Sequence, residues 1–175
     1  MTNILLISED YVKTHSGLNK NIWGDYLLPA IRDAQDIKLS TILGEDLYKT
    51  ILNKADTETL DGVYTTLLEE YIQVFLMYQS IADIIPLIAT KIGNLGVVVS
   101  NDEHITNLTQ GERELVQNTF IYKADFYARR LQNYLLKNKN EFPELDDVIC
   151  NQIKSNLDSS ATTTLWLGGY RGKKL

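Results

Sequence analysis

The chain has 175 residues, a length that corresponds to one domain and leaves no room for a second core of ordinary size. Its 17 basic and 23 acidic residues give a formal net charge of -6, which excludes a protein that coats duplex DNA, because neutralising phosphates requires a net basic face. Three basic residues, Arg171, Lys173 and Lys174, lie within the last five positions. Residues 1–170 therefore carry 14 basic and 23 acidic residues, a net charge of -9.

The sequence carries no pattern of export or membrane insertion. The apolar run at residues 4–7 is too short for a secretory signal and is followed by acidic residues. The single cysteine, Cys150, cannot form an internal disulfide, which fits a reducing compartment, and we interpret it as a small apolar helix residue. The longest uncharged part of the apolar region, residues 71–82, is shorter than the roughly 20 residues of a spanning helix, so we expect it in a protein interior.

The N-terminal part predicts an extended segment followed by two helices. Residues 3–7 are expected to be extended, and Ser8 to cap a brief helix that ends at residues 16–17. Apolar residues at steps of three and four predict the next helix over residues 25–36, with Pro29 inside its first turn.

A short helical piece over residues 39–43 is expected to stop at Gly44. Glu45 and Asp46 then open another helix with a single apolar stripe. The stripe comprises Leu47, Tyr48, Ile51 and Leu52.

Residues 63–92 carry the strongest helical signal in the chain. Apolar residues alternate steps of four and three without a miss, and a second seam at steps of seven leaves most of the circumference apolar. We therefore expect a central, largely buried helix with one polar ridge. The ridge comprises Thr66, Glu69, Glu70, Gln73, Ser80 and Asp83.

Two further signals interrupt or end this helix. Pro86 has no backbone N–H, so we expect a kink or break near residues 83–86. Residues 93–96 begin and end with glycine and should end the helix. The run Val97, Val98 and Val99 then predicts a short strand or hairpin edge.

The C-terminal part predicts two more helices. Thr109 and Glu112 have the spacing of a capping box and open a long helix over residues 112–139 that can pack along the central one. Pro143 is expected in the first turn of a final helix that ends near residue 156. The sequence thus predicts a mainly α fold: a helical bundle with two long packed helices, several short helices and a small β element. Residues 1–157 form the domain and residues 158–175 a flexible interaction tail.

No arrangement of reactive groups points to catalysis, a metal site or a cofactor. The Glu-x-x-His pairs of a di-iron bundle are missing, and the two histidines are 89 positions apart, which is no zinc spacing. Asp83 lies among isoleucines and alanine, and it is either a solvent-facing residue or one member of an inter-subunit ion pair. We therefore expect no enzyme.

The tail carries the clearest candidate for an interaction. Leu165, Trp166 and Leu167, followed by Tyr170, are large apolar residues after a polar, serine-rich stretch. This segment either folds back on its own bundle, for example against the valine run at residues 97–99, or adds to a neighbouring protein with Trp166 as its anchor. The basic end suits a solubilising terminus, a contact with an acidic partner or a contact with nucleic acid.

Several motifs resemble those of one known class of protein. The run LISEDYVKTHSGLNKNIWGDYLLPAIRDAQDIKLSTILGEDLYKTI at residues 6–51, with its AQD and LGEDLY motifs, and KIGNLGVVVS at residues 91–100 carry the likeness. Over residues 4–140 the chain resembles the head-to-tail connector (ring or adaptor) proteins of crAss-like and other Bacteroidetes phages. The tail does not align with them.

This resemblance implies a virion protein at the portal–tail junction, assembled in the bacterial host cytoplasm. It implies a homo-oligomeric ring, usually twelve-fold, that binds the portal protein above and tail or second ring proteins below. It transfers no catalytic residue. An acidic body suits a channel through which DNA passes with only transient contact, and Glu69, Glu70 and Asp83 are candidates to line it. The alternative from the residues is a soluble helical regulator of phage or bacterial origin that binds one protein partner.

Overall fold

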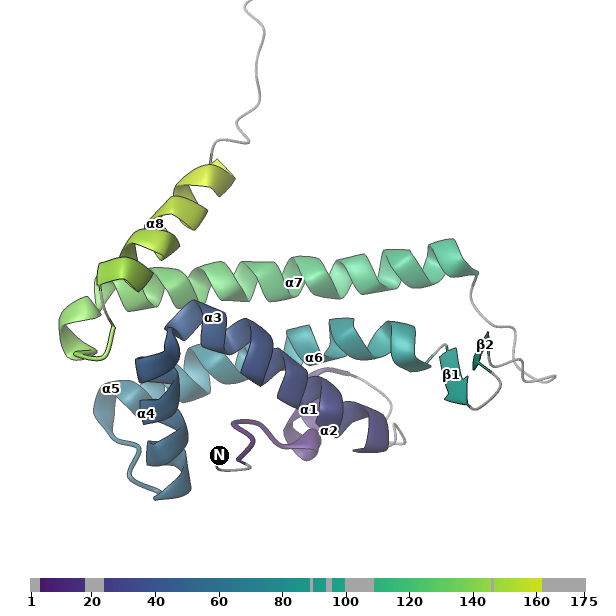
Figure 1. Cartoon of the computed structure of the whole chain (residues 1–175), viewed down its shortest axis with the longest axis horizontal. Helices are drawn as coiled ribbons and strands as arrows, with labels where there is room; N and C mark the ends of the chain where they lie inside the picture. Colours follow the sequence, from purple (N-terminus) through teal and green to yellow (C-terminus); the bar gives the residue numbers. More distant parts are fainter. Residues whose placement is uncertain are drawn as a thin grey trace, which may run out of the picture.

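The computed structural model describes residues 4–17, 24–88, 90–93, 96–99, 109–145 and 147–161. It is a mainly α structure, which confirms the expected fold class (Figure 1). The elements of the first half are α1 (Glu9–His15), α2 (Gly24–Asp33), the π-helix η1 (Ala34–Leu39), α3 (Ser40–Leu43), α4 (Glu45–Asp56), α5 (Gly62–Thr66) and the π-helix η2 (Leu67–Ile72). Those of the second half are α6 (Gln73–Ile88), β1 (Thr90–Gly93), β2 (Gly96–Val99), α7 (Gln110–Lys137), the short 3-10 helix η3 (Lys139–Glu141) and α8 (Asp147–Ala161).

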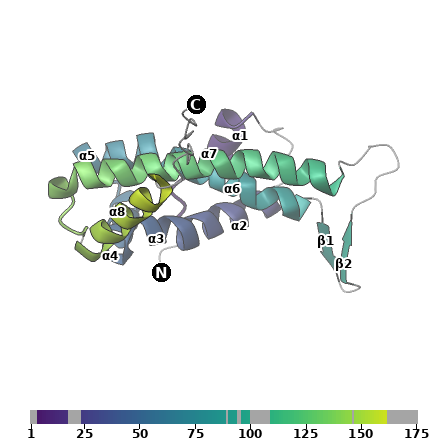
Figure 2. The ribbon, with the colours of Figure 1, turned by 90° about the horizontal axis from the view of Figure 1, so that it is seen from above.

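Two long helices, α6 and α7, form the spine of the bundle and run side by side over most of their length (Figures 1 and 2). The α2–η1–α3 rod packs on one flank of α6, and α1 lies on the other flank (Figure 2). The core between them is apolar because each helix turns its periodic apolar face inward. Its fully buried members include Leu27, Ile31, Leu76, Ile81 and Leu131.

Helix boundaries follow local chemistry where the sequence predicted them. The Ser8 hydroxyl accepts a hydrogen bond from the Tyr11 amide, and Thr109 and Glu112 form a complete capping box at the start of α7. Gly44 separates α3 from α4 with φ 76°, a backbone conformation that favours glycine. The stripe of α4 is buried as expected at Leu47 and Ile51.

The rod differs from the two pieces expected over residues 25–36 and 39–43, because α2, η1 and α3 are continuous. A π-helix shifts the apolar face by about one residue relative to the 3.6-residue period, so the pattern breaks there although the helix does not end. Pro29 lies five residues after the start of α2, beyond the expected first turn.

The central helix is also shorter than expected. It ends at Ile88, and residues 90–93 pair antiparallel with residues 96–99. The expected strand at Val97, Val98 and Val99 is therefore confirmed in its backbone as β2. The partner strand β1, however, comes from residues that were expected to end the central helix. Over so short a run, the sequence fits the helical period and the strand period equally well.

Two further expectations were wrong in detail. Ser80 was placed on the polar ridge, but it is fully buried, and its hydroxyl donates to the Leu76 carbonyl one turn earlier. The final helix begins at Asp147, after a turn that contains Pro143, and it extends to Ala161, beyond the expected end near residue 156.

Within the described residues, one helical stretch, Gly62–Ile88, is long and apolar enough by length and composition to cross a membrane. The core helix of a folded domain passes the same test, and here α6 packs against α7 and α2.

Candidate interaction surfaces

The β1–β2 hairpin extends beyond one end of the helical bundle (Figure 2). The sheet has two strands with Thr90 opposite Val99 and Ile92 opposite Val97, so each strand pairs along one edge in this part of the structure. A two-stranded hairpin is marginally stable by itself in water, and a free strand edge offers backbone N–H and C=O groups to another strand. The hairpin is therefore a candidate site for pairing with another protein.

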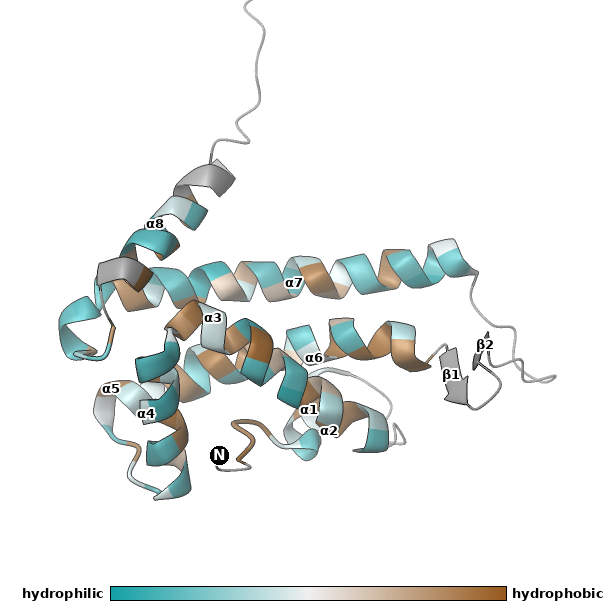
Figure 3. Ribbon diagram, viewed as in Figure 1, coloured by the Kyte–Doolittle hydropathy of each residue, from teal (hydrophilic) through white to brown (hydrophobic). Residues whose placement is uncertain are grey.

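Apolar side chains at the end of α6 lie next to the hairpin. Leu87 is partly exposed, and Ile88 is 50% exposed. Apolar residues colour this end of α6 in Figure 3. An exposed apolar surface beside an incomplete sheet is typical of a protein-binding site.

A side chain from α7 holds the end of α6 in place. Pro86 has no N–H to donate to the carbonyl of Ala82, four residues earlier. Gln117 of α7 donates its Nε2 to that carbonyl at 3.1 Å. The interaction satisfies a carbonyl that proline leaves without its helical donor and ties the base of the hairpin to the spine.

Asp83, the charged residue singled out in the sequence, is half-buried on α6. Its Oδ1 accepts a hydrogen bond from Gln79 at 3.0 Å. Burial raises the pKa of Asp83; the Gln79 hydrogen bond and the charge of Lys38 lower it, and the charge of Asp33 raises it. The carboxylate thus has a hydrogen-bond partner in its own chain, and charged residues of the rod influence its pKa. The inter-subunit ion pair stays a prediction.

The remaining candidates have different outcomes. Glu69 and Glu70 are exposed neighbours on η2, and their place in a channel stays a prediction. The tail residues Leu165, Trp166, Leu167 and Tyr170 lie outside the described residues.

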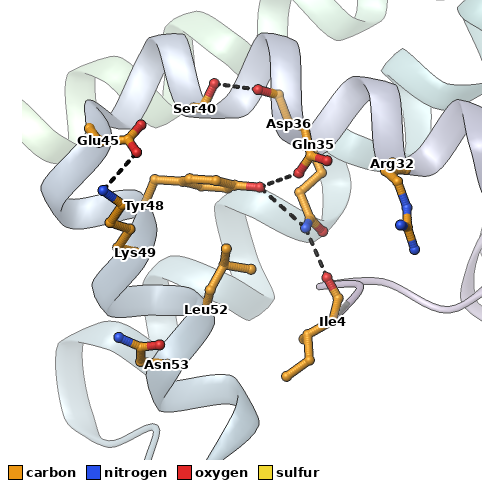
Figure 4. A pocket seen from close by; sticks show the side chains of 10 residues that line it. All are labelled: Ile4, Arg32, Gln35, Asp36, Ser40, Glu45, Tyr48, Lys49, Leu52 and Asn53. Atoms are coloured by element: carbon orange, nitrogen blue, oxygen red, sulfur yellow. Dashed lines mark hydrogen bonds and ion pairs between the residues drawn. The ribbon is translucent and has the colours of Figure 1, made fainter. Parts of the chain in front are cut away.

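A pocket of about 550 Å³ opens between the N-terminal segment, the rod and α4 (Figure 4). Arg32, Asp36, Tyr48 and Lys49 contribute polar groups to its wall. The Tyr48 hydroxyl donates to Asp36 Oδ1. Burial, together with this hydrogen bond, raises the pKa of Tyr48 to about 12, so at neutral pH the phenol keeps its proton and donates a hydrogen bond.

Two glutamines, one of them in the wall of this pocket, hold the N-terminal segment. Gln35 donates to the Ile4 carbonyl at 3.0 Å (Figure 4). It also accepts from the Leu6 amide at 2.8 Å. A neighbouring parallel strand would bind this same pair of groups. Gln73 donates to the Leu6 carbonyl at 3.4 Å. The sequence predicted the extended segment but not this clamp, because its two glutamines are 38 positions apart and share no motif.

The described residues contain no group of three or more His, Cys, Asp or Glu side chains that could hold a metal ion. Cys150 is buried, in agreement with its interpretation as a helix-packing residue. His15 Nδ1 lies 2.9 Å from the Tyr11 carbonyl, and its ring stacks on the Tyr11 ring at 4.3 Å. His15 is thus held against Tyr11 of the same helix.

Comparison with known proteins places the chain in a family without assigning it an activity. No curated protein and no solved structure matches it. Residues 39–155, more than half of the chain, match the model of a family of unknown function, DUF6712. This span runs from the end of η1 into α8 and so includes the spine, the hairpin and the first part of the last helix. The chain belongs to the DUF6712 family.

Proposed function

We propose that this protein is a structural subunit of a phage head-to-tail connector, a ring that joins the portal to the tail and surrounds the exiting DNA. The observation that carries the proposal is the β1–β2 hairpin, a two-stranded sheet that extends from the bundle beside exposed Leu87 and Ile88. Together with the resemblance of residues 4–140 to connector proteins, it supports a role in assembly.

A ring requires two different surfaces on each subunit, because a closed cyclic interface is heterologous. The hairpin offers one of them through strand pairing. In this proposal the hairpin of each subunit contacts a neighbouring subunit or the portal protein. The acidic body then faces passing DNA without gaining counterion release, which allows the DNA to slide.

The decisive experiment measures the mass of the assembly. We expect the purified chain, mixed with its portal protein, to form a complex of several copies per portal ring in native mass spectrometry and electron microscopy. A Val98→Pro variant removes one backbone donor from β2 and should abolish the complex while the far-ultraviolet circular dichroism of the helices is retained. A complex that forms equally well with this variant would contradict the role of the hairpin.

The alternative function, a soluble helical regulator that binds one protein partner, has one observation in its favour. Among the described residues, no buried side-chain N or O atom is left without a hydrogen bond, so a single copy forms a satisfied core. A stable monomer or dimer that has no affinity for the portal would support the regulator and refute the connector.

A further inference from the structure

Helix α7 has apolar side chains on two opposite faces. Ala124 and Leu131 face the core and are buried. Leu115, Tyr122 and Phe126 follow at steps of seven and four, so they share one side of the helix, roughly opposite the core face. Their exposed fractions are 69%, 74% and 57%. We call these three residues the outer stripe.

The outer stripe is as large as the apolar patches that often mark a binding site. Given that an aromatic side chain covers about 150–250 Å², the three residues expose roughly 400 Å², which is the size of the largest apolar patch on a typical monomer, a patch that is often functional. A stable interface between two proteins buries about 800 Å² on each side, so the stripe supplies only half of one. Its size suits a short segment better than a second globular surface.

The chain itself supplies such a segment close by. Helix α8 rises from the C-terminal end of α7, and its last turn lies over α7, on the side away from α6 (Figures 1 and 2). Fourteen residues, 162–175, follow its last residue, Ala161. At about 3.3 Å per residue, Leu165, Trp166 and Leu167 can lie up to roughly 13–20 Å from that point, and the stripe itself spans about 16 Å.

Charge along α7 favours one direction for this segment. Glu114 is exposed beside the Leu115 end of the outer stripe, whereas Arg129 is exposed beyond its Phe126 end. The segment ends in Arg171, Lys173 and Lys174. With Trp166 at the Phe126 end of the stripe, these basic residues lie up to roughly 16–26 Å further along, and Glu114 is about 18 Å from Phe126 along the helix.

We propose that the outer stripe of α7 is the docking site for the C-terminal segment of the same chain, with Trp166 packed on Tyr122 and Phe126. Tethering favours the chain's own segment, because a short linker gives an effective concentration in the millimolar range. This interaction goes beyond the proposed connector function and does not depend on it.

The test uses the fluorescence of Trp166 in the full-length chain. The sequence has two tryptophans, so a Trp23→Phe variant leaves Trp166 as the single reporter. We expect its emission to be blue-shifted and protected from acrylamide relative to a free peptide of residues 162–175, and to stay the same on dilution. Adding Tyr122→Ser and Phe126→Ser should move both readings to those of the peptide.

A matched control is Ile37→Ser, which removes another exposed apolar side chain, 60% exposed, from the rod and should leave Trp166 unchanged. Circular dichroism and thermal unfolding are measured for every variant to check that it is folded. Leu115→Ser gives a second disruption that keeps both aromatic rings. The proposal is overturned if Trp166 already resembles the free peptide, or if the stripe variants do not move its emission. It is also overturned if the signal depends on dilution, because a neighbouring copy would then be the occupant.

Discussion

Replacing Gln35 with alanine tests whether the glutamine clamp holds the N-terminal segment. Gln35 is only 2% exposed, and its loss leaves the buried Leu6 amide without its acceptor. An unsatisfied buried amide costs about 1–3 kcal/mol, and the removed methylene adds up to about 1 kcal/mol of lost burial. The Ile4 carbonyl is half-buried, so water can replace part of its hydrogen bond. We expect a total destabilisation of about 3 kcal/mol.

For a chain of this length, a loss of that size lowers the Tm by roughly 6–12 °C. Urea and thermal unfolding measure the stability, and hydrogen exchange at the Leu6 amide reports the local opening. The matched control is Gln152→Ala, the same change at an exposed position of α8, which should alter stability by less than about 0.5 kcal/mol. If Gln35→Ala melts like the control and the Leu6 amide keeps its protection, the clamp does not hold the segment and the reasoning fails.

Three other changes probe the junctions of the fold. Gly44→Ala forces an L-residue to φ 76° and places its Cβ 2.8 Å from Ile149 Cγ1. We expect the free energy of unfolding, measured in urea, to fall by about 2 kcal/mol or more. Adding Ile149→Ala should restore only the part of this loss that comes from the steric clash. Gln117→Leu should lower the free energy of unfolding by about 1 kcal/mol. In a Pro86→Ala background the loss should be small, because a backbone N–H can again donate to the Ala82 carbonyl. Equal losses in both backgrounds would refute the role of the Gln117 hydrogen bond. The folded pKa of Tyr48 is about 12 and the ordinary value is 10.0, so the unfolded chain loses its phenolic proton first. The stability that is present below pH 10 should therefore fall between pH 10 and pH 12, and Tyr48→Phe should make this decline in urea midpoints shallower.

The amino-acid sequence determined the elements whose causes are local. The hydroxyl of Ser8 and the pair Thr109 and Glu112 cap their helices through groups within three residues of one another. Gly44 ends a helix because its own backbone takes a positive φ. The periodic apolar faces likewise predicted that α6 and α7 pack together, since each can bury its stripe only against another helix.

Tertiary structure decided the features whose partners are far apart in the chain. Whether residues 90–93 continued a helix or formed a strand depended on pairing with residues 96–99, and the π-helix η1 made two apparent helices into one rod. Ser80 became buried because neighbouring helices cover its side of α6. The clamp of Gln35 and Gln73 exists only once two helices meet around Leu6. Local hydrogen bonds and periodicity are encoded in neighbouring residues, whereas burial and long-range partners depend on how complete helices pack.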